Sequence, residues 1–293
     1  MNKFSYNEIV SRIKKLKELS QQNAEPSEFY QYFEPLMSQL PLGASSIKSE
    51  FLFRSRWNKK GELFESVEDL IYPKPNLVLR KGRLNNIGES ILYASPSELG
   101  TIVESRPDLN KLFTISKIKI LNKNLIYLAT GNLNNSGKIY ASRNNELVTD
   151  FIHSELTKNV ENPEDYNSTI AMANFFFNKK VSNFSNVKYL NIIYPSVEAS
   201  KISNQKMQNV AIKSEVFDNN YEIIQATVYC LINNETHYTL TDLNITENIN
   251  KNGDLEWRYN FDQMIERISM GLSLNGIPVS NLIGIEKDLL KSI

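Results

Sequence analysis

The stretch KGRLNNIGESILYASPSELGTIVE, residues 81–104, contains several local structural signals in close succession. Its glycines and asparagines predict a turn that includes Arg83, preceded by a strand at residues 77–83, LVLRKGR. The apolar run after the turn predicts a second strand around Tyr93, and the last part predicts a helix that carries Glu104. A strand–turn–strand–helix unit of this kind can direct the side chains of Arg83, Tyr93 and Glu104 towards one cleft.

Both ends of the expected helix are marked in the sequence. Ser95 is a plausible N-cap, with Pro96 at the first helical position and Glu98 completing a capping box. Pro107 cannot continue the helix and should end it. The helix that carries Glu104 is therefore expected to begin at Pro96 and to end before Pro107.

Helical and strand-like segments are mixed along the rest of the chain, without a regular alternation of strand and helix. Apolar residues at helical spacing predict helices, at residues 9–19, 29–40, 147–156, 166–177 and 260–272. Short apolar runs between turn residues predict strands, at residues 51–57, 90–95, 112–121, 124–130, 187–196, 209–217 and 222–232. This order favours an α+β fold over a doubly wound parallel sheet.

The chain of 293 residues is long enough for one large domain or two small ones. The change of pattern after the first two helices predicts an N-terminal helical hairpin at residues 1–45 and a main domain at residues 46–240. Residues 241–293 are expected to form a helical segment packed on that domain. The apolar stripes of the hairpin must be buried, so it should pack on the main domain or on a second copy of the chain.

The charge balance and the apolar pattern restrict the possible partners. Lys and Arg together number 33, as do Asp and Glu, which leaves no cationic surplus for a general nucleic-acid binder. No apolar run is long enough to predict a membrane-spanning helix, and the first residues lack the apolar core of a signal peptide. We therefore expect a cytoplasmic protein that binds neither nucleic acid nor membrane.

The few cysteine and histidine residues restrict the chemistry. Cys230 is the single cysteine, so no internal disulfide can form, and with His153 and His237 it cannot make up a zinc site. Carboxylates are numerous enough for a Mg²⁺ or Ca²⁺ site, but their spacing does not match an EF-hand, and no metal is expected. Cys230 should be a buried core thiol, and the two histidines should be ordinary surface or packing residues. Any catalysis must then come from Arg, Glu, Asp, Ser, Tyr and the backbone.

The residue types in the 81–104 stretch suit the binding of a nucleotide. A guanidinium such as that of Arg83 pairs with two oxygens of a diphosphate. A ring such as Tyr93 offers a stacking face, and a carboxylate such as Glu104 suits a developing oxocarbenium ion. Each residue also has an ordinary alternative: a solvated turn arginine, a packing tyrosine at a strand end and a surface glutamate. Spacing alone does not decide between these interpretations.

A hydroxyl follows another expected strand, YLNIIYPS at residues 189–196. Pro195 ends the strand and holds Ser196 in a defined position, and ligand-binding groups often lie at such points. A nucleophilic serine would need a nearby base, and neither histidine is close in sequence. Ser196 is therefore expected to form hydrogen bonds to a ligand, with a plain turn serine as the alternative.

Four motifs in this order resemble the RES domain, a family named for its Arg, Glu and Ser residues. They are FRSRW at residues 53–57, GRLNNIG at 82–88, ILYAS at 91–95 with Glu104 after it, and IIYPS at 192–196 followed by NVAI at 209–212. The resemblance covers about residues 50–235. It implies an ADP-ribosyltransferase-like fold with an N-terminal helical extension. It also implies cleavage of the nicotinamide–ribose bond of NAD⁺, by hydrolysis or phosphorolysis.

The resemblance assigns roles to individual residues. Arg83 would hold the pyrophosphate or the nicotinamide ribose, and Tyr93 would stack on the nicotinamide. Glu104 would stabilise the ribosyl cation as the N-glycosidic bond breaks, and Ser196 would position the nicotinamide or its ribose. NAD⁺ would be the substrate, with no further cofactor. RES proteins are typically bacterial toxins, so a cognate antitoxin, or a second copy bound through the hairpin, is the expected protein partner.

The sequence also departs from the family pattern. After Ser196 the family often has a basic residue and glycines, whereas residues 197–208 are VEASKISNQKMQ. Arg54 and Arg56 compete for the role of the first-strand arginine, which would contact the substrate. Two alternatives to NAD⁺ degradation stay open: a mono-ADP-ribosyltransferase that acts on a macromolecule, and a non-catalytic protein that binds a nucleotide or a protein.

Overall fold

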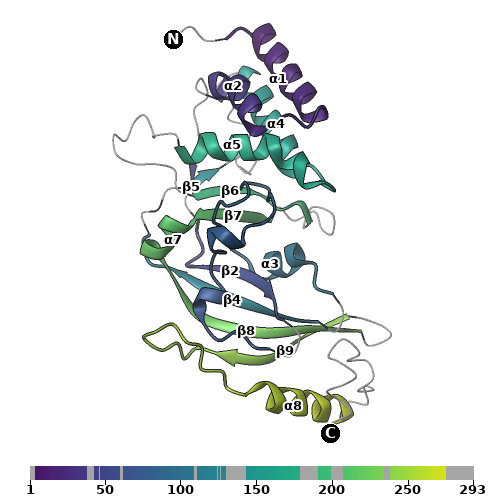
Figure 1. Cartoon of the computed structure of the whole chain (residues 1–293), viewed down its shortest axis with the longest axis vertical. Coiled ribbons are helices and arrows are strands. Elements are labelled where there is room, and N and C mark those ends of the chain that lie inside the picture. Colours follow the sequence, from purple (N-terminus) through teal and green to yellow (C-terminus); the bar gives the residue numbers. More distant parts are fainter. Residues whose placement is uncertain are drawn as a thin grey trace. The chain divides into compact units, whose positions relative to one another are not determined.

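The computed structural model describes residues 4–37, 43–45, 47–59, 62–108, 111–123, 125, 127–129, 143–178, 191–198, 207–233 and 238–274. Its contacts divide the chain into two compact units, each with its own β-sheet (Figure 1). The first unit comprises Met1–Lys48, Pro73–Tyr93 and Asn122–Asn219; the second comprises Ser49–Tyr72, Ala94–Leu121 and Asn220–Ile293. Helices and sheets together make an α+β fold, as the sequence predicted.

The N-terminal hairpin consists of α1 (Tyr6–Gln21) and α2 (Pro26–Met37). A capping box begins α1: the Ser5 hydroxyl oxygen accepts the Glu8 backbone N–H, and the Glu8 carboxylate accepts that of Ser5. The chain turns between the helices at Asn23, whose φ of 51° lies in the left-handed region that asparagine tolerates. The two helices therefore form close to the predicted positions.

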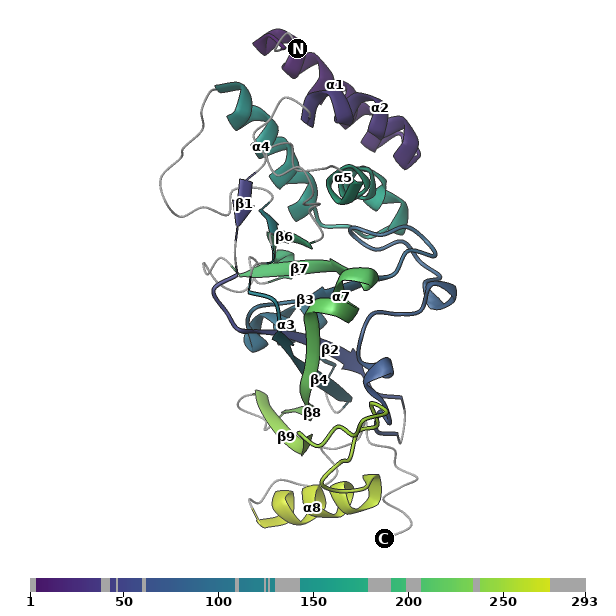
Figure 2. The ribbon, with the colours of Figure 1, turned by 90° about the vertical axis from the view of Figure 1, so that its left-hand side faces the viewer.

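The hairpin packs on two further helices of the first unit, α4 (Arg143–Thr157) and α5 (Asn167–Asn178). Figures 1 and 2 show α4 and α5 between the hairpin and the strands of the first unit. The ring of Phe33 meets Phe175 and Phe176 edge-on, with centroids 5.9 and 6.0 Å apart, a favourable arrangement for aromatic pairs. The apolar stripes of the hairpin are thus buried in the core of their own unit.

The sheet of the first unit has the strand order β1-β5-β6-β7-β3. These strands are β1 (Gly43–Ser45), β5 (Tyr127–Ala129), β6 (Asn191–Pro195), β7 (Gln208–Lys213) and β3 (Ile91–Ala94). β6 runs parallel to β5 and antiparallel to β7. All of β6 is buried, and its Ile192 and Tyr194 share one core with α4 and α5. A single strand, β7, separates β3 from β6, so the segments that carry Tyr93 and Ser196 belong to one sheet.

The sheet of the second unit is antiparallel throughout, in the order β2-β4-β8-β9. Its strands are β2 (Phe51–Trp57), β4 (Leu112–Ile120), β8 (Tyr221–Asn233) and β9 (Tyr238–Thr246). The helix α3 (Glu98–Ser105) packs on β2, where the Thr101 hydroxyl donates to the Phe53 carbonyl oxygen over 2.8 Å. The helix with Glu104 and the strand with Arg54 and Arg56 are therefore neighbours.

The last described helix, α8 (Phe261–Leu274), packs against β9. Met264 and Ile265 on this helix are buried with Val228 and Cys230 of the second sheet. Cys230 is thus a buried core thiol, as the sequence predicted. Among the described residues, no helix combines the length and the apolar character needed to cross a membrane.

The N-cap of α3 lies two residues later than predicted. Ser97 is the cap, and its hydroxyl oxygen accepts the backbone N–H of Gly100 over 3.2 Å. Ser95 instead pairs with Phe53 through two backbone hydrogen bonds. A strand contact with a distant part of the chain therefore overrides the local capping signal, and Pro96 precedes the helix.

The strand predicted at residues 77–83 is wrong. A single 3₁₀ turn, η2 (Pro75–Leu77), leads into an irregular segment. Leu77 and Leu79 are 64% and 75% exposed. Only Val78 of this apolar run is buried. Since strand preference depends largely on packing against neighbours, a run with two of its three apolar side chains exposed has little to hold it in a sheet.

Two further strands differ from the sequence prediction. The strand expected at residues 209–217 ends at Lys213, and α7 (Ser214–Asn220) follows it. The adjacent side chains of Val216 and Phe217 are both buried, which departs from the alternation of a strand with one buried face. β9 was missed by the strand prediction, because an irregularity in its register leaves Leu243 unmatched and interrupts the alternation.

The two units do not follow the domain bounds expected from the sequence. Residues 46–240, expected as one main domain, contribute to both units, and the hairpin belongs to the first. The segment expected to be helical from residue 241 begins within β9 and reaches α8 only at Phe261. Residues 275–293 lie outside the described residues. Contacts between segments far apart in sequence decide these groupings.

Candidate functional site

Tyr93 on β3 is the centre of the candidate site in the first unit. Its phenol oxygen accepts the backbone N–H of Leu84 over 2.9 Å, and its hydroxyl donates to Oδ1 of Asn85 over 2.8 Å. Burial raises the pKa of Tyr93 well above its ordinary value, although the Leu84 hydrogen bond and the positive charge of Arg83 oppose this shift. The hydroxyl therefore stays protonated at neutral pH and keeps its bond to Asn85.

Gly82 allows the turn to approach Tyr93 closely. A Cβ atom at position 82 would lie 2.3 Å from Oδ1 of Asn85 and 3.3 Å from the phenol oxygen of Tyr93. We expect Gly82→Ala to displace the Asn85 side chain, which leaves the phenol without its acceptor. The free energy of unfolding should fall by about 1–2 kcal/mol, as urea unfolding would measure.

A double-mutant cycle tests the origin of this effect. In an Asn85→Ala background the atom that the new methyl group would meet is absent. Gly82→Ala should then lower the free energy of unfolding much less. We expect a coupling energy of about 1 kcal/mol between positions 82 and 85. An equal loss of unfolding free energy in both backgrounds would contradict the proposed clash between the Cβ atom at position 82 and Asn85.

Arg83 has a structural contact through one nitrogen, and its other nitrogens donate to no atom of the described residues. Its Nη1 donates to the carbonyl oxygens of Leu156 and Lys158 over 2.8 and 3.2 Å. These acceptors lie at the C-terminal end of α4, where helices leave carbonyl groups unpaired. The guanidinium also lies over the ring of Tyr166, 5.3 Å from its centroid. Within the described part of the chain, Nε and Nη2 donate to no protein atom, so two nitrogens stay available for a ligand.

Three residues of this site are missing from the sequence prediction: Asn85, Tyr166 and Thr169. The Thr169 hydroxyl donates to the carbonyl oxygen of Arg83 and so ties the turn to α5. Asn85 is part of the GRLNNIG motif, which could have singled it out. Tyr166 and Thr169 have no local signal, because they meet the turn only through folding of a segment more than 80 residues away.

Ser196 directly follows β6 and is almost fully buried, with 3% of its surface exposed. Its backbone N–H donates to the carbonyl oxygen of Met207 over 3.0 Å, which fixes the chain beyond the strand. Two residues earlier, the ring of Tyr194 packs edge-on against Tyr93, with centroids 6.5 Å apart. The structure therefore brings together the Arg83 turn, Tyr93 and the strand end that precedes Ser196.

The remaining predicted residues belong to the second unit. Arg54 and Arg56 are two positions apart on β2, so their side chains leave the same face of the strand. Nη1 of Arg56 donates to the carbonyl oxygen of Asp69; burial lowers the pKa of Arg56, and the Asp69 charge opposes this shift. Glu104 is half-buried near the end of α3. These three residues thus lie on two elements that pack against each other.

The residues expected to be structural are placed as follows. Cys230 is fully buried on β8, and His153 is half-buried on α4. His237 lies outside the described residues. Among the residues that the structure describes, no group of three or more His, Cys, Asp or Glu side chains could hold a metal ion.

The buried thiol predicts a loss of stability in alkali. Burial raises the pKa of Cys230 to about 12, above its ordinary value of 9.0. Above about pH 9 the unfolded chain therefore loses the thiol proton while the folded chain keeps it, so stability falls as the pH rises towards 12. Cys230→Ala removes this dependence.

Urea unfolding of both proteins at two pH values would measure the effect. Between about pH 8 and pH 10.5, the wild-type chain should lose about 2 kcal/mol relative to Cys230→Ala. The smaller alanine side chain changes the free energy of unfolding by the same amount at both pH values, so this change cancels in the comparison. A constant difference between the proteins would contradict the raised pKa.

The residues of the first unit combine an anchored guanidinium, a protonated phenol and a buried strand end. Such a set can pair with a phosphate group and pack on a planar ring. Comparison with known protein families found no match, and comparison with curated proteins found no relative.

Proposed function

We propose that the chain is an NAD⁺-degrading enzyme of the RES type, which cleaves the bond between nicotinamide and ribose. The observation that supports this proposal is the meeting of three motif segments around Tyr93. Its hydroxyl bonds residues 84–85, and its ring contacts Tyr194, two residues before Ser196. The RES resemblance assigns substrate contacts to these segments, and also to Glu104 and to one of Arg54 and Arg56 in the second unit.

Arg83 is suited to the diphosphate of NAD⁺. Its contact with the end of α4 holds the guanidinium in place, so little side-chain freedom is lost on binding. The nitrogens Nε and Nη2 could then donate to two oxygens of the diphosphate, the bidentate geometry in which arginine binds anions most strongly. A lysine could not serve both the helix end and the diphosphate in this way.

The proposed reaction needs few catalytic groups. Nicotinamide leaves NAD⁺ as a neutral molecule when the glycosidic carbon–nitrogen bond breaks, so no general acid is required. The resemblance assigns the stabilisation of the developing ribosyl cation to the carboxylate of Glu104, which lies on α3 of the second unit. Attack by water on the ribose carbon gives ADP-ribose and a proton; attack by inorganic phosphate gives the phosphorylated ADP-ribose. The buried Ser196 would orient the substrate and form no bond to it.

Incubation with NAD⁺, with and without phosphate, tests this function. Chromatography should show nicotinamide together with ADP-ribose, or with phosphorylated ADP-ribose when phosphate is the acceptor. Labelled protein instead of a free product would favour a mono-ADP-ribosyltransferase. Intact NAD⁺ with a folded, soluble chain would contradict the proposal and favour the non-catalytic alternative.

Such an enzyme would act on the NAD⁺ pool of the cytoplasm. Induced expression in bacteria should arrest growth and lower NAD⁺ before membrane integrity fails. As for other toxins of this kind, a cognate antitoxin would then be the expected protein partner. Normal growth and unchanged NAD⁺ at high soluble expression would contradict the toxin function.

A further inference from the structure

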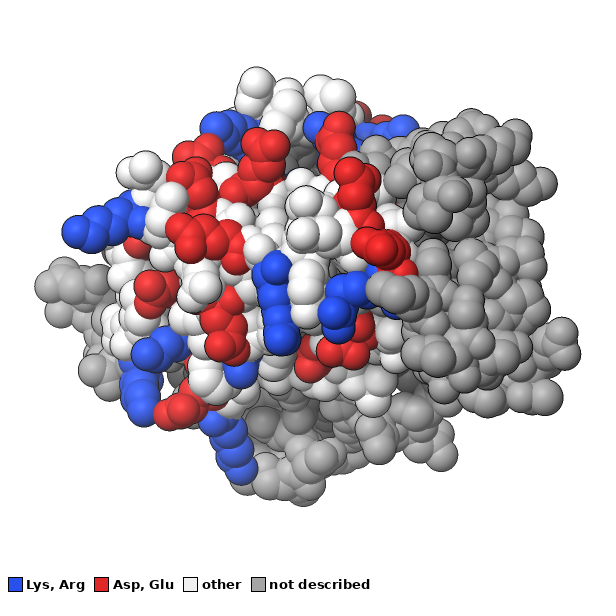
Figure 3. All heavy atoms as spheres, turned by 90° about the horizontal axis from the view of Figure 1, so that it is seen from below, with Lys and Arg blue, Asp and Glu red and all other residues white. Residues whose placement is uncertain are grey.

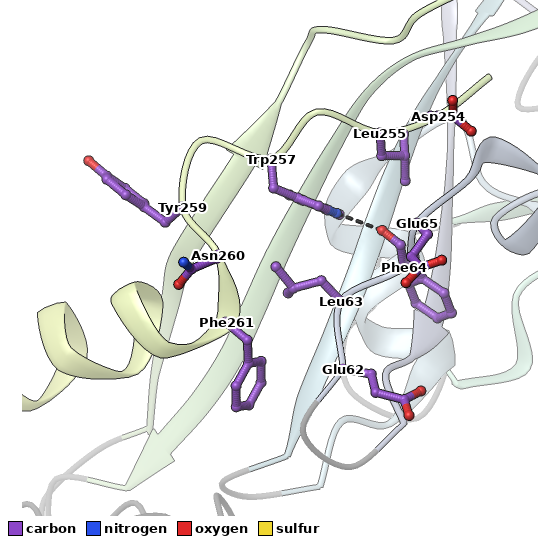
Figure 4. A pocket seen from close by; sticks show the side chains of 10 residues that line it. All are labelled: Glu62, Leu63, Phe64, Glu65, Asp254, Leu255, Trp257, Tyr259, Asn260 and Phe261. Carbon is purple, nitrogen blue, oxygen red and sulfur yellow. Dashed lines mark hydrogen bonds between the residues drawn. The ribbon is translucent and has the colours of Figure 1, made fainter. Parts of the chain in front are cut away.

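A groove in the second unit takes no part in the proposed NAD⁺ chemistry. Two segments contribute to it, through residues 62–65 and residues 254, 255, 257 and 259–261, and its volume is about 660 Å³ (Figure 4). Figure 4 shows Leu63 between Trp257 and Phe261, and all three side chains are half-buried against the same small core. Aromatic side chains of this kind are enriched where proteins bind one another, and tryptophan is prominent among the residues that contribute most.

Hydrogen bonds join the two walls of the groove. The indole N–H of Trp257 donates to the carbonyl oxygen of Phe64 over 2.6 Å, as drawn in Figure 4. The backbone N–H of Leu255 donates to the carbonyl oxygen of Glu65 over 2.7 Å. Because these hydrogen bonds already fix the walls, a ligand that binds between them orders few protein groups. The loss of conformational entropy on binding is therefore small.

The rim of the groove is acidic. Glu62, Glu65 and Asp254 are exposed, and none of the described residues that line the groove is a lysine or arginine. Asp254 accepts a hydrogen bond from the Asn250 amide over 2.7 Å. No donor of the described residues reaches the carboxylates of Glu62 and Glu65. Two negative charges at the groove therefore lack a counterion from the described part of the chain.

The acidic character extends beyond the groove. In residues 62–69 and 238–267, exposed carboxylates outnumber exposed lysines and arginines by ten to three, although the whole chain has no net charge. Figure 3, the view from below, shows more Asp and Glu than Lys and Arg on the described part of that face. A surface with this charge attracts basic partners and repels acidic ones.

The two ends of the groove differ in charge. At one end, the guanidinium groups of Arg258 and Arg267 lie over the ring of Tyr259, 5.5 and 4.4 Å from its centroid. Figure 4 shows Tyr259 directed away from the Glu65 side of the groove. A bound cation is therefore favoured near Glu62 and Glu65, away from the arginines.

We propose that this groove binds a basic segment of a protein partner, in which a leucine or phenylalanine lies among lysines or arginines. The apolar side chain packs on Leu63, Trp257 and Phe261, and the neighbouring cations pair with Glu62 and Glu65. Apolar contact supplies most of the affinity, and the acidic rim selects the sign of the partner's charge. The proposal concerns the second unit and does not depend on the NAD⁺ activity.

Short synthetic peptides test the proposal on the full chain. A fluorescein-labelled peptide of alternating lysine and leucine should bind with a Kd on the order of 10–100 μM, measured by fluorescence anisotropy at low salt. Peptides with glutamate in place of lysine, or serine in place of leucine, should bind at least about tenfold more weakly. In a Trp57→Phe protein, Trp257 is the remaining tryptophan. Its emission should change when the unlabelled lysine–leucine peptide binds.

Paired substitutions locate the site. Glu62→Gln with Glu65→Gln should weaken peptide binding at least about fivefold. The control pair Glu247→Gln with Glu266→Gln removes the same charge from exposed positions outside the groove, and it should weaken binding less than about twofold.

Several results would overturn the proposal. They are equal weakening by both pairs, equal binding of the serine and leucine peptides, or unchanged emission of Trp257 at saturating peptide. Self-association of the chain that the Glu62 and Glu65 substitutions abolish would also overturn it, because a second copy would then be the occupant. Light scattering measures that self-association.

Discussion

A Glu104→Gln protein is expected to bind NAD⁺ about as well as the wild-type chain and to turn it over at least about 100-fold more slowly. In the proposed mechanism the carboxylate acts on the ribosyl cation, whose charge develops only as nicotinamide leaves. Glutamine keeps the size of the side chain, so the packing of α3 on β2 should persist. Calorimetry would measure NAD⁺ binding, and chromatography would measure nicotinamide release.

Glu222→Gln is the matched control for this substitution. Glu222 is exposed on β8 of the same unit, and its loss removes the same charge from the chain. Turnover by this control should stay within about twofold of the wild-type value. Near-normal turnover by a folded Glu104→Gln protein would rule out the proposed role of Glu104.

Arg83→Ala is expected to change binding, turnover and stability together. NAD⁺ affinity should fall about tenfold or more and turnover about 100-fold or more, because a diphosphate contact acts in both the ground state and the transition state. The free energy of unfolding should also fall by about 1–3 kcal/mol, because the carbonyl groups of Leu156 and Lys158 lose their donor. Calorimetry with NAD⁺, turnover assays and urea unfolding would measure the three effects.

Two further variants separate the ligand contact from the structural one. Arg83→Lys keeps a positive charge but lacks the planar fork, so it should restore part of the stability and little of the NAD⁺ affinity. Arg80→Ala removes an exposed arginine from the same segment and should change neither quantity. If a folded Arg83→Ala protein bound NAD⁺ with unchanged affinity, Arg83 would have a structural role only, through its contact with α4.

The substitutions at positions 83 and 104 should also be non-additive. Both groups are proposed to act on the cleavage of one bond, so the double variant should lose much less activity than the product of the single losses. Independent, multiplicative losses in turnover would indicate that the two residues do not act on the same step.

Sequence patterns could predict the residue types of the site, but not all of their contacts. The motif around Arg83 and the strand with Tyr93 are local features, and both occur close to where the sequence placed them. The sequence suggested a solvated turn or a ligand contact for Arg83, whereas its Nη1 supports the end of a helix 73 residues away. The aromatic contact between Tyr93 and Tyr194 likewise depends on the strand order of the sheet.

The sequence by itself determined the helices of the hairpin, the α+β class and the burial of Cys230. Each of these follows from periodicity, capping or apolar character within short segments. Such local properties do not depend on contacts with residues far away in the sequence. Only the tertiary structure decided that residues 77–83 are irregular, that Ser97 caps α3 and that two segments form the acidic groove. These outcomes depend on which surfaces become buried and which backbone groups find partners across the chain. Local preferences of about 1 kcal/mol or less are overridden by such contacts.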